Sequence, residues 1–261
     1  MRISKHQIYL FACRVNPVYF LYGLTPCRYV EYAWILEQLG EEIDGRLILD
    51  IGSGRSLLPL YLARSGAKVW ASDITSAVNV MQSRMARTAG LYHLITEKSL
   101  NTGVQDARSL VFGEDTFDFV IACSILEHIP REGDISAIME MSRVLKRGGV
   151  LIITVPYGPR YREAKAPFDS EDVHRLYDDR QIRIRLEKPS GLSLFRLDFI
   201  GVKRPHWFDL FYSPSKTRLT RAVLGWLNLL IPESIFGFVQ YEKRKILSGG
   251  VLIALKKPLL D

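Results

Sequence analysis

The chain alternates short apolar runs with stretches whose apolar residues recur at helical spacing. The apolar runs that we expect to form strands cover residues 47–51, 68–72, 117–122 and 150–155. Helical spacing predicts helices over residues 56–64, from Thr75 or Ser76 to Thr88, and over residues 134–145. Strands that are apolar on both faces and separated by helices are typical of a parallel sheet covered on both sides. The pattern therefore predicts an α/β fold.

The rest of the chain adds elements to this core. Before the first strand, apolar residues at helical spacing predict a helix over residues 26–40. The polar stretch that follows the second helix is expected to contain a short strand ending near Asp106. Residues 192–199 and 250–255 are strand-like without a crossover helix between them, which predicts an antiparallel pair at the sheet edge. Residues 146–149 are expected to end the helix before them, because cations and glycines suit a helix C-terminus.

A glycine turn directly follows the first predicted strand. Asp50, Gly52 and Gly54 form the turn, and Asp73 ends the next predicted strand. Glycines let backbone N–H groups approach a ligand, and an acid about 20 residues further on can accept hydrogen bonds from ribose hydroxyls. The dinucleotide fingerprint needs a third glycine where this chain has Leu57, so a nicotinamide dinucleotide is disfavoured. We therefore expect a different cofactor that contains adenosine.

Composition sets the wider context. The chain has 261 residues, 48% of them hydrophobic, which suits one large globular domain. Its three cysteines, Cys13, Cys27 and Cys123, show no paired spacing, which favours a cytoplasmic protein without structural disulfides or zinc. No apolar run has the length of a membrane span. The net charge of +7 suits an anionic partner, such as nucleic acid or anionic lipid, and equally a solvated basic surface.

Four further segments follow the glycine turn in a fixed order. In one-letter code they are DARSL from Asp106, FDFVIA from Phe117, LEH from Leu126 and EMSRVLKRGG from Glu140. Together with the D-x-G-x-G turn, they resemble the class I S-adenosylmethionine (SAM)-dependent methyltransferases, most closely the small-molecule and lipid-type members (methyltransferase type 11-like). The resemblance covers residues 47–156. Ser56 and Arg147 stand where the family pattern has a glycine and a proline.

The resemblance implies a fold and a division of the chain. The fold is a Rossmann-like, seven-stranded, mostly parallel sheet with helices on both faces and an antiparallel C-terminal hairpin. A single methyltransferase domain would cover residues 1–261. Within it, residues 1–45 would be an N-terminal helical cap, 46–156 the SAM-binding core, 157–240 a substrate-side insertion and 241–261 the final strand.

The resemblance also implies the cofactor, SAM, with S-adenosylhomocysteine as product, and the residues that bind it. These are Arg28, Asp50, Gly52, Ser53, Gly54, Asp73, Ile74, Asp106, Ala107, Cys123 and Ser124. The two glycines would admit the methionine portion and the ribose. Asp50 would hold either the loop or the amino group, and Arg28 would reach the methionine carboxylate. Asp73 would accept the ribose hydroxyls and Asp106 the adenine amino group. Ile74 would pack on adenine, while Cys123 and Ser124 would line the sulfonium side.

Methyl transfer from SAM mainly requires alignment of the acceptor and exclusion of water. The sequence offers no cluster of metal ligands, so no metal is expected. His128, after the fourth strand, and His174, in the insertion, are the candidate catalytic residues. A neutral histidine can take a proton from a hydroxyl or amine acceptor. A structural role for His128, shaping the loop with Glu127, stays open.

The acceptor is expected to be a small molecule or a lipid-like compound. The basic insertion favours an alternative, methylation of RNA or protein, although the fourth strand lacks the N-P-P-Y tetrapeptide of many base-amino methylases. A non-catalytic SAM-binding protein is a second alternative, because the acids report binding and not turnover. Residues 218–238 combine apolar and basic side chains, which suits contact with a membrane surface and equally a buried helix.

Overall fold

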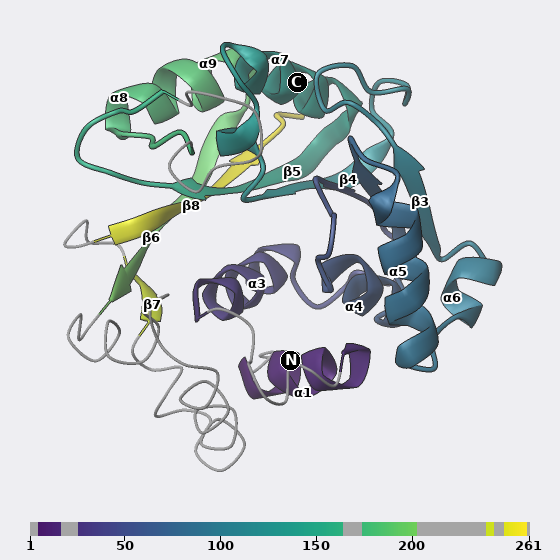
Figure 1. The fold of residues 1–261 in the computed structure, drawn as a ribbon. Helices are drawn as coiled ribbons and strands as arrows, with labels where there is room; N and C mark the ends of the chain where they lie inside the picture. Colours follow the sequence, from purple (N-terminus) through teal and green to yellow (C-terminus); the bar gives the residue numbers. More distant parts are fainter. Residues whose placement is uncertain (1–4, 17–25, 164–173, 203–238, 243–247, 260–261) are drawn as a thin grey trace.

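The computed structural model describes residues 5–16, 26–163, 174–202, 239–242 and 248–259. In these residues, eight strands form one sheet in the order β3-β2-β1-β4-β5-β8-β6-β7 (Figure 1). The neighbours from β3 to β5 are parallel, whereas β8 is antiparallel to both β5 and β6. The predicted fold class is confirmed. The short strand β7 adds an edge strand beyond the seven expected, antiparallel to β6.

The elements follow one another as the α/β pattern predicts. The strands are β1 (Leu47–Ile51), β2 (Lys68–Asp73), β3 (Leu100–Val104), β4 (Phe117–Cys123), β5 (Leu145–Pro156), β6 (Ser193–Val202), β7 (Val239–Glu242) and β8 (Ser248–Lys256). The main helices are α1 (Lys5–Val15), α3 (Pro26–Leu39), α4 (Leu58–Arg64), α5 (Ala77–Thr88), α6 (His93–Thr96) and α7 (Gly133–Val144). Shorter turns complete the chain: the 3-10 turn η1 (Leu126–His128), α8 (Asp179–Gln181), the π-helical turn η2 (Ile182–Glu187) and α9 (Lys188–Ser190).

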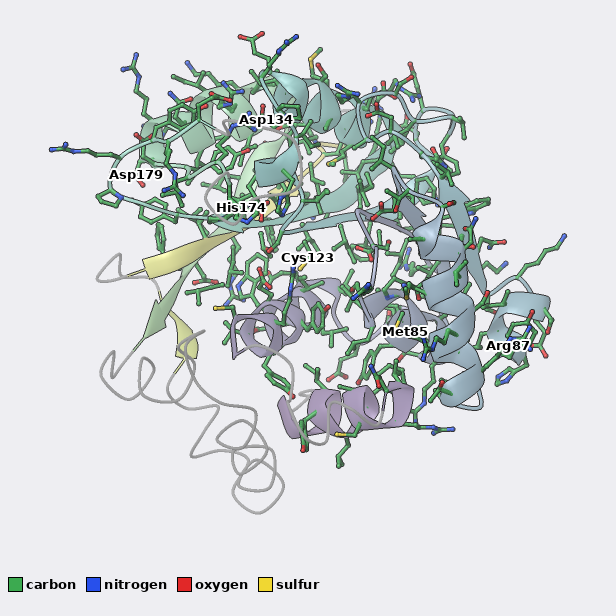
Figure 2. All side chains as sticks on the ribbon, viewed as in Figure 1. Met85, Arg87, Cys123, Asp134, His174 and Asp179 are labelled. Carbon is green, nitrogen blue, oxygen red and sulfur yellow. The ribbon has the colours of Figure 1, made fainter. Side chains whose placement is uncertain are left out.

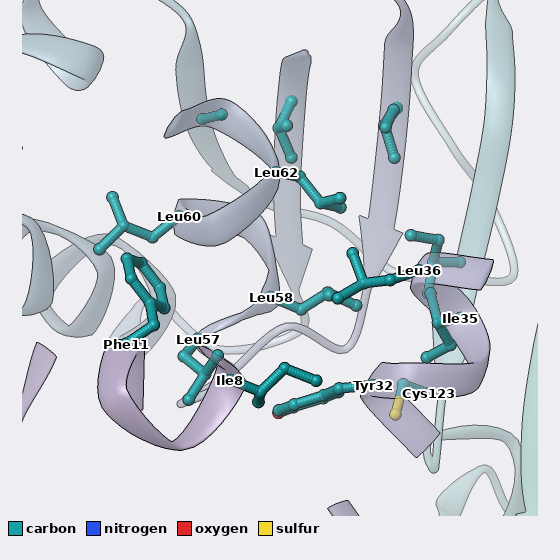
Figure 3. Packing of buried hydrophobic residues seen from close by; sticks show 14 of the residues in the cluster. Ile8, Phe11, Tyr32, Ile35, Leu36, Leu57, Leu58, Leu60, Leu62 and Cys123 are labelled. Carbon is teal, nitrogen blue, oxygen red and sulfur yellow. The ribbon is translucent and has the colours of Figure 1, made fainter. Parts of the chain in front are cut away.

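Helices cover both faces of the sheet, and alternate strand residues enter two separate cores. Helices α1, α3 and α4 lie on one side, and α7, α8 and α9 lie on the other (Figure 1). Along β4, Ile121 and Cys123 pack with the first group, whereas Val120 and Ala122 pack with the second. Figure 3 shows the first core, where side chains of α1, α3 and α4 meet. Because both faces are buried, the central strands are mostly apolar, which made them recognisable in the sequence.

Several boundaries differ from the predictions. Helix α4 begins at Leu58 and not at residue 56, because the chain first completes the glycine turn. Helix α7 ends at Val144, and Leu145 already has extended backbone angles. Residues 146–149 therefore belong to β5 and do not cap the helix, although Gly148 has a positive φ of 75°.

The order of the strands reverses between the neighbouring strands β1 and β4. Chain connections run from β1 outward to β2 and β3, then return to β4 on the other side of β1. Helices on either side of such a reversal diverge, so ligands of open α/β sheets bind at the carboxyl ends of these two strands. Asp50, Gly52, Cys123 and Ser124 lie at these ends.

The division into cap, core, insertion and final strand stays a prediction. Most of the predicted insertion, including residues 218–238, lies outside the described residues. Across the described part of the chain, each helix is too short or too polar to cross a bilayer.

Candidate functional site

The glycine turn after β1 is held tightly against two neighbouring segments. Gly52 has φ +70°, and a Cβ added to it would lie 2.5 Å from Cγ1 of Ile125, in the loop after β4. Gly54 has φ +39°, and its N–H donates to Oδ2 of Asp73 over 3.0 Å. Ser53 stabilises the turn, because its hydroxyl donates to the carbonyl of Asp50 over 2.7 Å. The turn needs glycine for both its conformation and its close contacts.

Asp73 ends β2 and faces the glycine turn. Its Oδ2 accepts the Gly54 N–H, and its Oδ1 accepts both the N–H and the hydroxyl of Thr75, each over 3.0 Å. A carboxylate has about four acceptor positions, so these bonds leave room for a further donor. These local hydrogen bonds therefore orient the Asp73 carboxylate and leave it able to accept another one from a ligand.

A pocket of about 180 Å³ opens beside Asp73, and we call it the open pocket. It is lined by Ile51, Gly52, Asp73, Ile74, Gln105, Asp106, Ala107, Arg108, Ile125, Ile129 and Pro130. Five of the predicted cofactor-binding residues meet here from the ends of β1, β2 and β3. The pocket combines apolar walls with two carboxylates, as small-molecule sites commonly do.

Asp106 lies on the far wall of the open pocket and pairs with Arg108. The guanidinium donates to both carboxylate oxygens, at 2.9 Å to Oδ1 and 2.6 Å to Oδ2. These hydrogen bonds lower the pKa of Asp106, so the group is ionised near neutral pH. The sequence pattern did not predict the hydrogen bonds between Arg108 and the Asp106 carboxylate.

Asp50 is buried at the end of β1, with 1% of its surface exposed. Among the described residues, its Oδ2 has no hydrogen-bond partner. Burial raises the pKa of Asp50 to about 7. A buried acceptor without a donor is costly, and a cationic or N–H-bearing ligand would satisfy it.

A second group of polar residues, which we call the buried cluster, joins α3 to the ends of β4 and β5. Its members are Arg28, Glu31, Cys123, Ser124 and Thr154. Oε1 of Glu31 accepts from the hydroxyls of Ser124 and Thr154 at 2.7 and 2.8 Å, and Oε2 accepts from Arg28 at 3.1 Å. These bonds hold Ser124 at an unusual φ of +51°.

Arg28 reaches from α3 to the sulfur of Cys123. Its Nη1 lies 3.0 Å from Sγ, and the Arg28 side chain is 35% exposed. Burial raises the pKa of the Cys123 thiol, which therefore stays protonated at neutral pH. Figure 2 shows Cys123 between the sheet and α3. The predicted residues Arg28, Cys123 and Ser124 thus meet, although in bonds with one another and with Glu31.

The two candidate catalytic histidines are in contact. Nδ1 of His128, in η1, lies 3.0 Å from Nδ1 of His174, and the two rings meet edge to face. Burial, the His174 ring and the Arg28 guanidinium lower the pKa of His128 to about 4, so its ring is neutral at pH 7. Beside it, burial raises the pKa of Glu127 to about 8. This contact spans 46 residues of sequence and was not predicted.

Taken together, the described residues form an α/β sheet with a polar ligand site at its strand reversal. The site has a glycine turn, a carboxylate at the end of β2, a second one after β3, and a buried acid, Asp50, with one oxygen that has no hydrogen-bond partner among the described residues. Open α/β sheets bind nucleoside-containing ligands at such a place.

Comparison with known proteins finds similarity to methyltransferases. Residues 49–153 match the family model described as a methyltransferase domain. The chain is 33% identical over 122 residues to the methyltransferase GfsG of Streptomyces halstedii, covering 45% of this chain and 41% of that protein. It is 30% identical over 160 residues to the ubiquinone biosynthesis O-methyltransferase of Xanthomonas oryzae pv. oryzae, covering 60% of each. The matches span 41% and 60% of the length of these relatives.

Solved structures share the fold. The [4+2]-cyclase SpnF superposes with a TM-score of 0.59 at 19% identity, over 99% of this chain and 98% of the cyclase. Geranyl diphosphate C-methyltransferase from Streptomyces coelicolor A3(2) gives a TM-score of 0.59 at 17% identity, over 91% of this chain and 82% of that one. The chain is thus similar to known methyltransferases in sequence over residues 49–153, and it shares its fold with solved structures over most of its length.

Proposed function

We propose that this protein binds SAM and transfers its methyl group directly to a small-molecule or lipid-like acceptor. The observation that carries the proposal is Oδ2 of Asp50, which is buried, has no hydrogen-bond partner among the described residues, and directly precedes Ile51 and Gly52 in the lining of the open pocket. The ammonium group of a methionine moiety would satisfy that oxygen, while the open pocket has the lining that adenosine requires. Bound SAM would supply a methyl group on a cationic sulfur, ready for in-line displacement.

Each half of the cofactor would meet a different set of residues. In the open pocket, Asp73 would accept the ribose hydroxyls, Ile74 would pack on adenine, and Asp106 would accept the adenine amino group. In the buried cluster, the guanidinium of Arg28 would bind the methionine carboxylate. Cys123 and Ser124 would then face the sulfur, at the end of β4.

The histidine pair favours an acceptor that loses a proton on methylation. A neutral His128 can accept a proton from a hydroxyl or an amine, and its lowered pKa keeps it neutral at physiological pH. His174 would orient the His128 ring. An O-methyltransferase among the relatives agrees with such an acceptor. Acceptors without a dissociable proton would not need this base.

Calorimetry with SAM and an acceptor screen tests the proposal. We expect SAM to bind, and S-adenosylhomocysteine to accumulate only when a hydroxyl- or amine-bearing acceptor is added. His128→Gln should then slow transfer at least tenfold while SAM affinity stays unchanged. His93→Gln, on the exposed end of α6, is the matched control.

A second candidate is a SAM-binding protein with a different activity. This candidate is supported by the structural match over 99% of this chain to a protein described as a cyclase. Binding of SAM without S-adenosylhomocysteine formation from any acceptor, RNA or protein included, would support this candidate and overturn methyl transfer.

A further inference from the structure

A buried group of charged residues lies next to the histidine pair, outside the residues expected to bind cofactor. Its centre is Asp134 in α7, which has no exposed surface. Arg185 donates to both oxygens of Asp134, at 2.8 Å from Nε and 2.7 Å from Nη2. Nη1 of Arg175 lies 3.0 Å from Oδ2, and the Tyr177 hydroxyl donates to the same oxygen over 2.8 Å. A fully buried carboxylate is thus neutralised by two guanidinium groups.

Arg175 differs from Arg185 in what else it binds. Its Nη1 donates to the carbonyl of Leu126 over 3.2 Å, and its backbone N–H donates to the carbonyl of Glu127 over 3.1 Å. Leu126 and Glu127 are the two residues before His128 in η1. In the described structure Arg185 makes neither bond: it donates to Asp134 and to the carbonyl of Arg131, and its guanidinium lies 5.9 Å from the centre of the Tyr161 ring.

The anchoring of Arg175 therefore sets the position of its neighbour, His174. Tyr177, two residues further on, donates its N–H to the carbonyl of Pro156, at the end of β5. The chain around Arg175 is thus fixed on both the η1 turn and the strand, and His174 is carried to His128. Figure 2 shows His174 below Asp134 on this side of the sheet.

Only one proton fits between two Nδ1 atoms that are 3.0 Å apart. One ring must therefore carry its proton on Nδ1, and the other must accept there and carry its proton on Nε2. We propose that Arg175 is a positioning residue that seats His174 against His128 and thereby fixes which nitrogen of His128 carries a proton. Its importance for catalysis rests on the proposed function, whereas the seating itself does not.

At least three groups of the described residues act on the His128 ring. The His174 ring contacts it, Arg28 lies near enough to lower its pKa, and the carboxyl of Glu127 is 3.9 Å from its Nε2. Release of His174 removes the first influence and increases the exposure of the ring. We therefore expect the pKa of His128 to rise from about 4 toward the ordinary value of about 6.5.

Nuclear magnetic resonance of the histidine rings in the full chain tests the proposal. The chain has five histidines, and His128→Gln and His174→Gln spectra assign the two signals. At pH 7 the native His128 nitrogens should show one fixed tautomer. In Arg175→Lys they should move to the averaged shifts of a free histidine, and the His128 pKa should rise. Arg185→Lys is the matched control, because it disturbs the same Asp134 yet should leave the His128 signals in place.

A second variant guards against misfolding of Arg175→Lys. Glu163, whose side chain is 45% exposed, accepts from Nη2 of Arg175 over 2.8 Å, so Glu163→Gln loosens the same guanidinium at the surface. It should move the His128 signals in the same direction by a smaller amount. Equal changes in Arg175→Lys and Arg185→Lys, or unmoved signals in Glu163→Gln and every folded Arg175 variant, would overturn the proposal.

The spectra need neither cofactor nor acceptor, so they separate this inference from the proposed function. If no methyl transfer is found while the His128 signals respond as described, the positioning role of Arg175 is supported and the proposed function is wrong. If transfer occurs, the acid limb of its pH profile should move to higher pH in Arg175→Lys and stay in place in Arg185→Lys.

Discussion

The open pocket and the buried cluster lie on the same edge of the sheet, and they treat their polar groups differently. In the open pocket, Asp73 keeps room for a further donor beside its bonds to Gly54 and Thr75, although Arg108 already binds both oxygens of Asp106. In the buried cluster, Glu31 uses both of its oxygens to accept from Arg28, Ser124 and Thr154. A ligand entering the pocket adds bonds to Asp73, which is already oriented. A ligand reaching the cluster must exchange existing bonds for new ones, so the two ends should contribute unequally to affinity.

The largest expected effect is that of Gly52→Ala, on the wall of the open pocket. Gly52 has φ +70°, a conformation that alanine adopts only with strain, and the added methyl group would lie 2.5 Å from the Ile125 side chain. The positive φ and the overpacking together should lower the free energy of unfolding by about 3 kcal/mol. Urea denaturation measures this loss.

Gly45→Ala is the matched control for that variant. Gly45 has φ +71°, but a Cβ there meets nothing within 4 Å. It should lose only the backbone part, about 1 kcal/mol. Equal losses in the two variants would mean that the turn and the loop after β4 are not in tight contact.

Asp73→Ala should weaken S-adenosylhomocysteine binding about 30-fold, or about 2 kcal/mol. The variant removes a charged acceptor for two hydroxyls and frees the Gly54 N–H. Glu97→Ala, at an exposed site after α6, should leave the dissociation constant unchanged. An unaltered constant in Asp73→Ala would remove this residue from the site.

Glu31→Gln tests the buried cluster through stability. Loss of the charge weakens the bonds to Arg28, Ser124 and Thr154, so the free energy of unfolding should fall by about 1.5 kcal/mol. Glu37→Gln, on the same helix, breaks an ion pair to Arg196 at a side chain that is 46% exposed, and should cost about 0.5 kcal/mol or less. Similar losses in the two variants would show that the cluster is not held by the Glu31 charge.

The smallest effect is a proton released when SAM binds. The pKa of Asp50 is raised to about 7, so the ligand-free protein holds this proton at pH 6. Because an ammonium group favours the carboxylate, binding at pH 6 should release close to one proton, and binding at pH 8 almost none. Calorimetry in two buffers of different ionisation enthalpy measures the release. Asp50→Asn should abolish it, and a release that persists in that variant would assign the proton elsewhere.

The raised pKa of Asp50 also makes the free energy of unfolding depend on pH. The unfolded chain loses the Asp50 proton near pH 4, and the folded chain loses it at about 7. The contribution of Asp50 to stability is therefore greatest below pH 4 and is lost as the pH rises to about 7. Asp50→Asn should accordingly gain stability relative to the native protein between these values.

The sheet and the open pocket could be predicted because their signals are local. Strands buried on both faces are mostly apolar, and β1 was predicted with its observed ends, Leu47–Ile51. The glycines and acids that follow such strands meet at one edge by topology alone. The start of α4 was missed although Pro59 lies in its first turn, a position that proline favours. The end of α7 was missed because the backbone becomes extended at Leu145 without a distinctive residue.

The buried cluster and the anchor of Arg175 could not be predicted in the same way. Glu31 and Asp134 are charged residues on amphipathic helices, where a charge normally indicates the solvated face. Their burial follows from partners that are 93 and 51 residues away, Ser124 and Arg185. His128 and His174 were both predicted as candidates, but their contact depends on tertiary packing that no local pattern records.

Titration calorimetry of the full chain with S-adenosylhomocysteine and with NAD, under the same conditions, tests the central claim most directly. The open pocket, the acid at the end of β2 and the Asp50 Oδ2 atom that lacks a partner among the described residues predict saturable binding of S-adenosylhomocysteine and no heat with NAD. Heat with NAD and none with the adenosyl ligand would contradict the account.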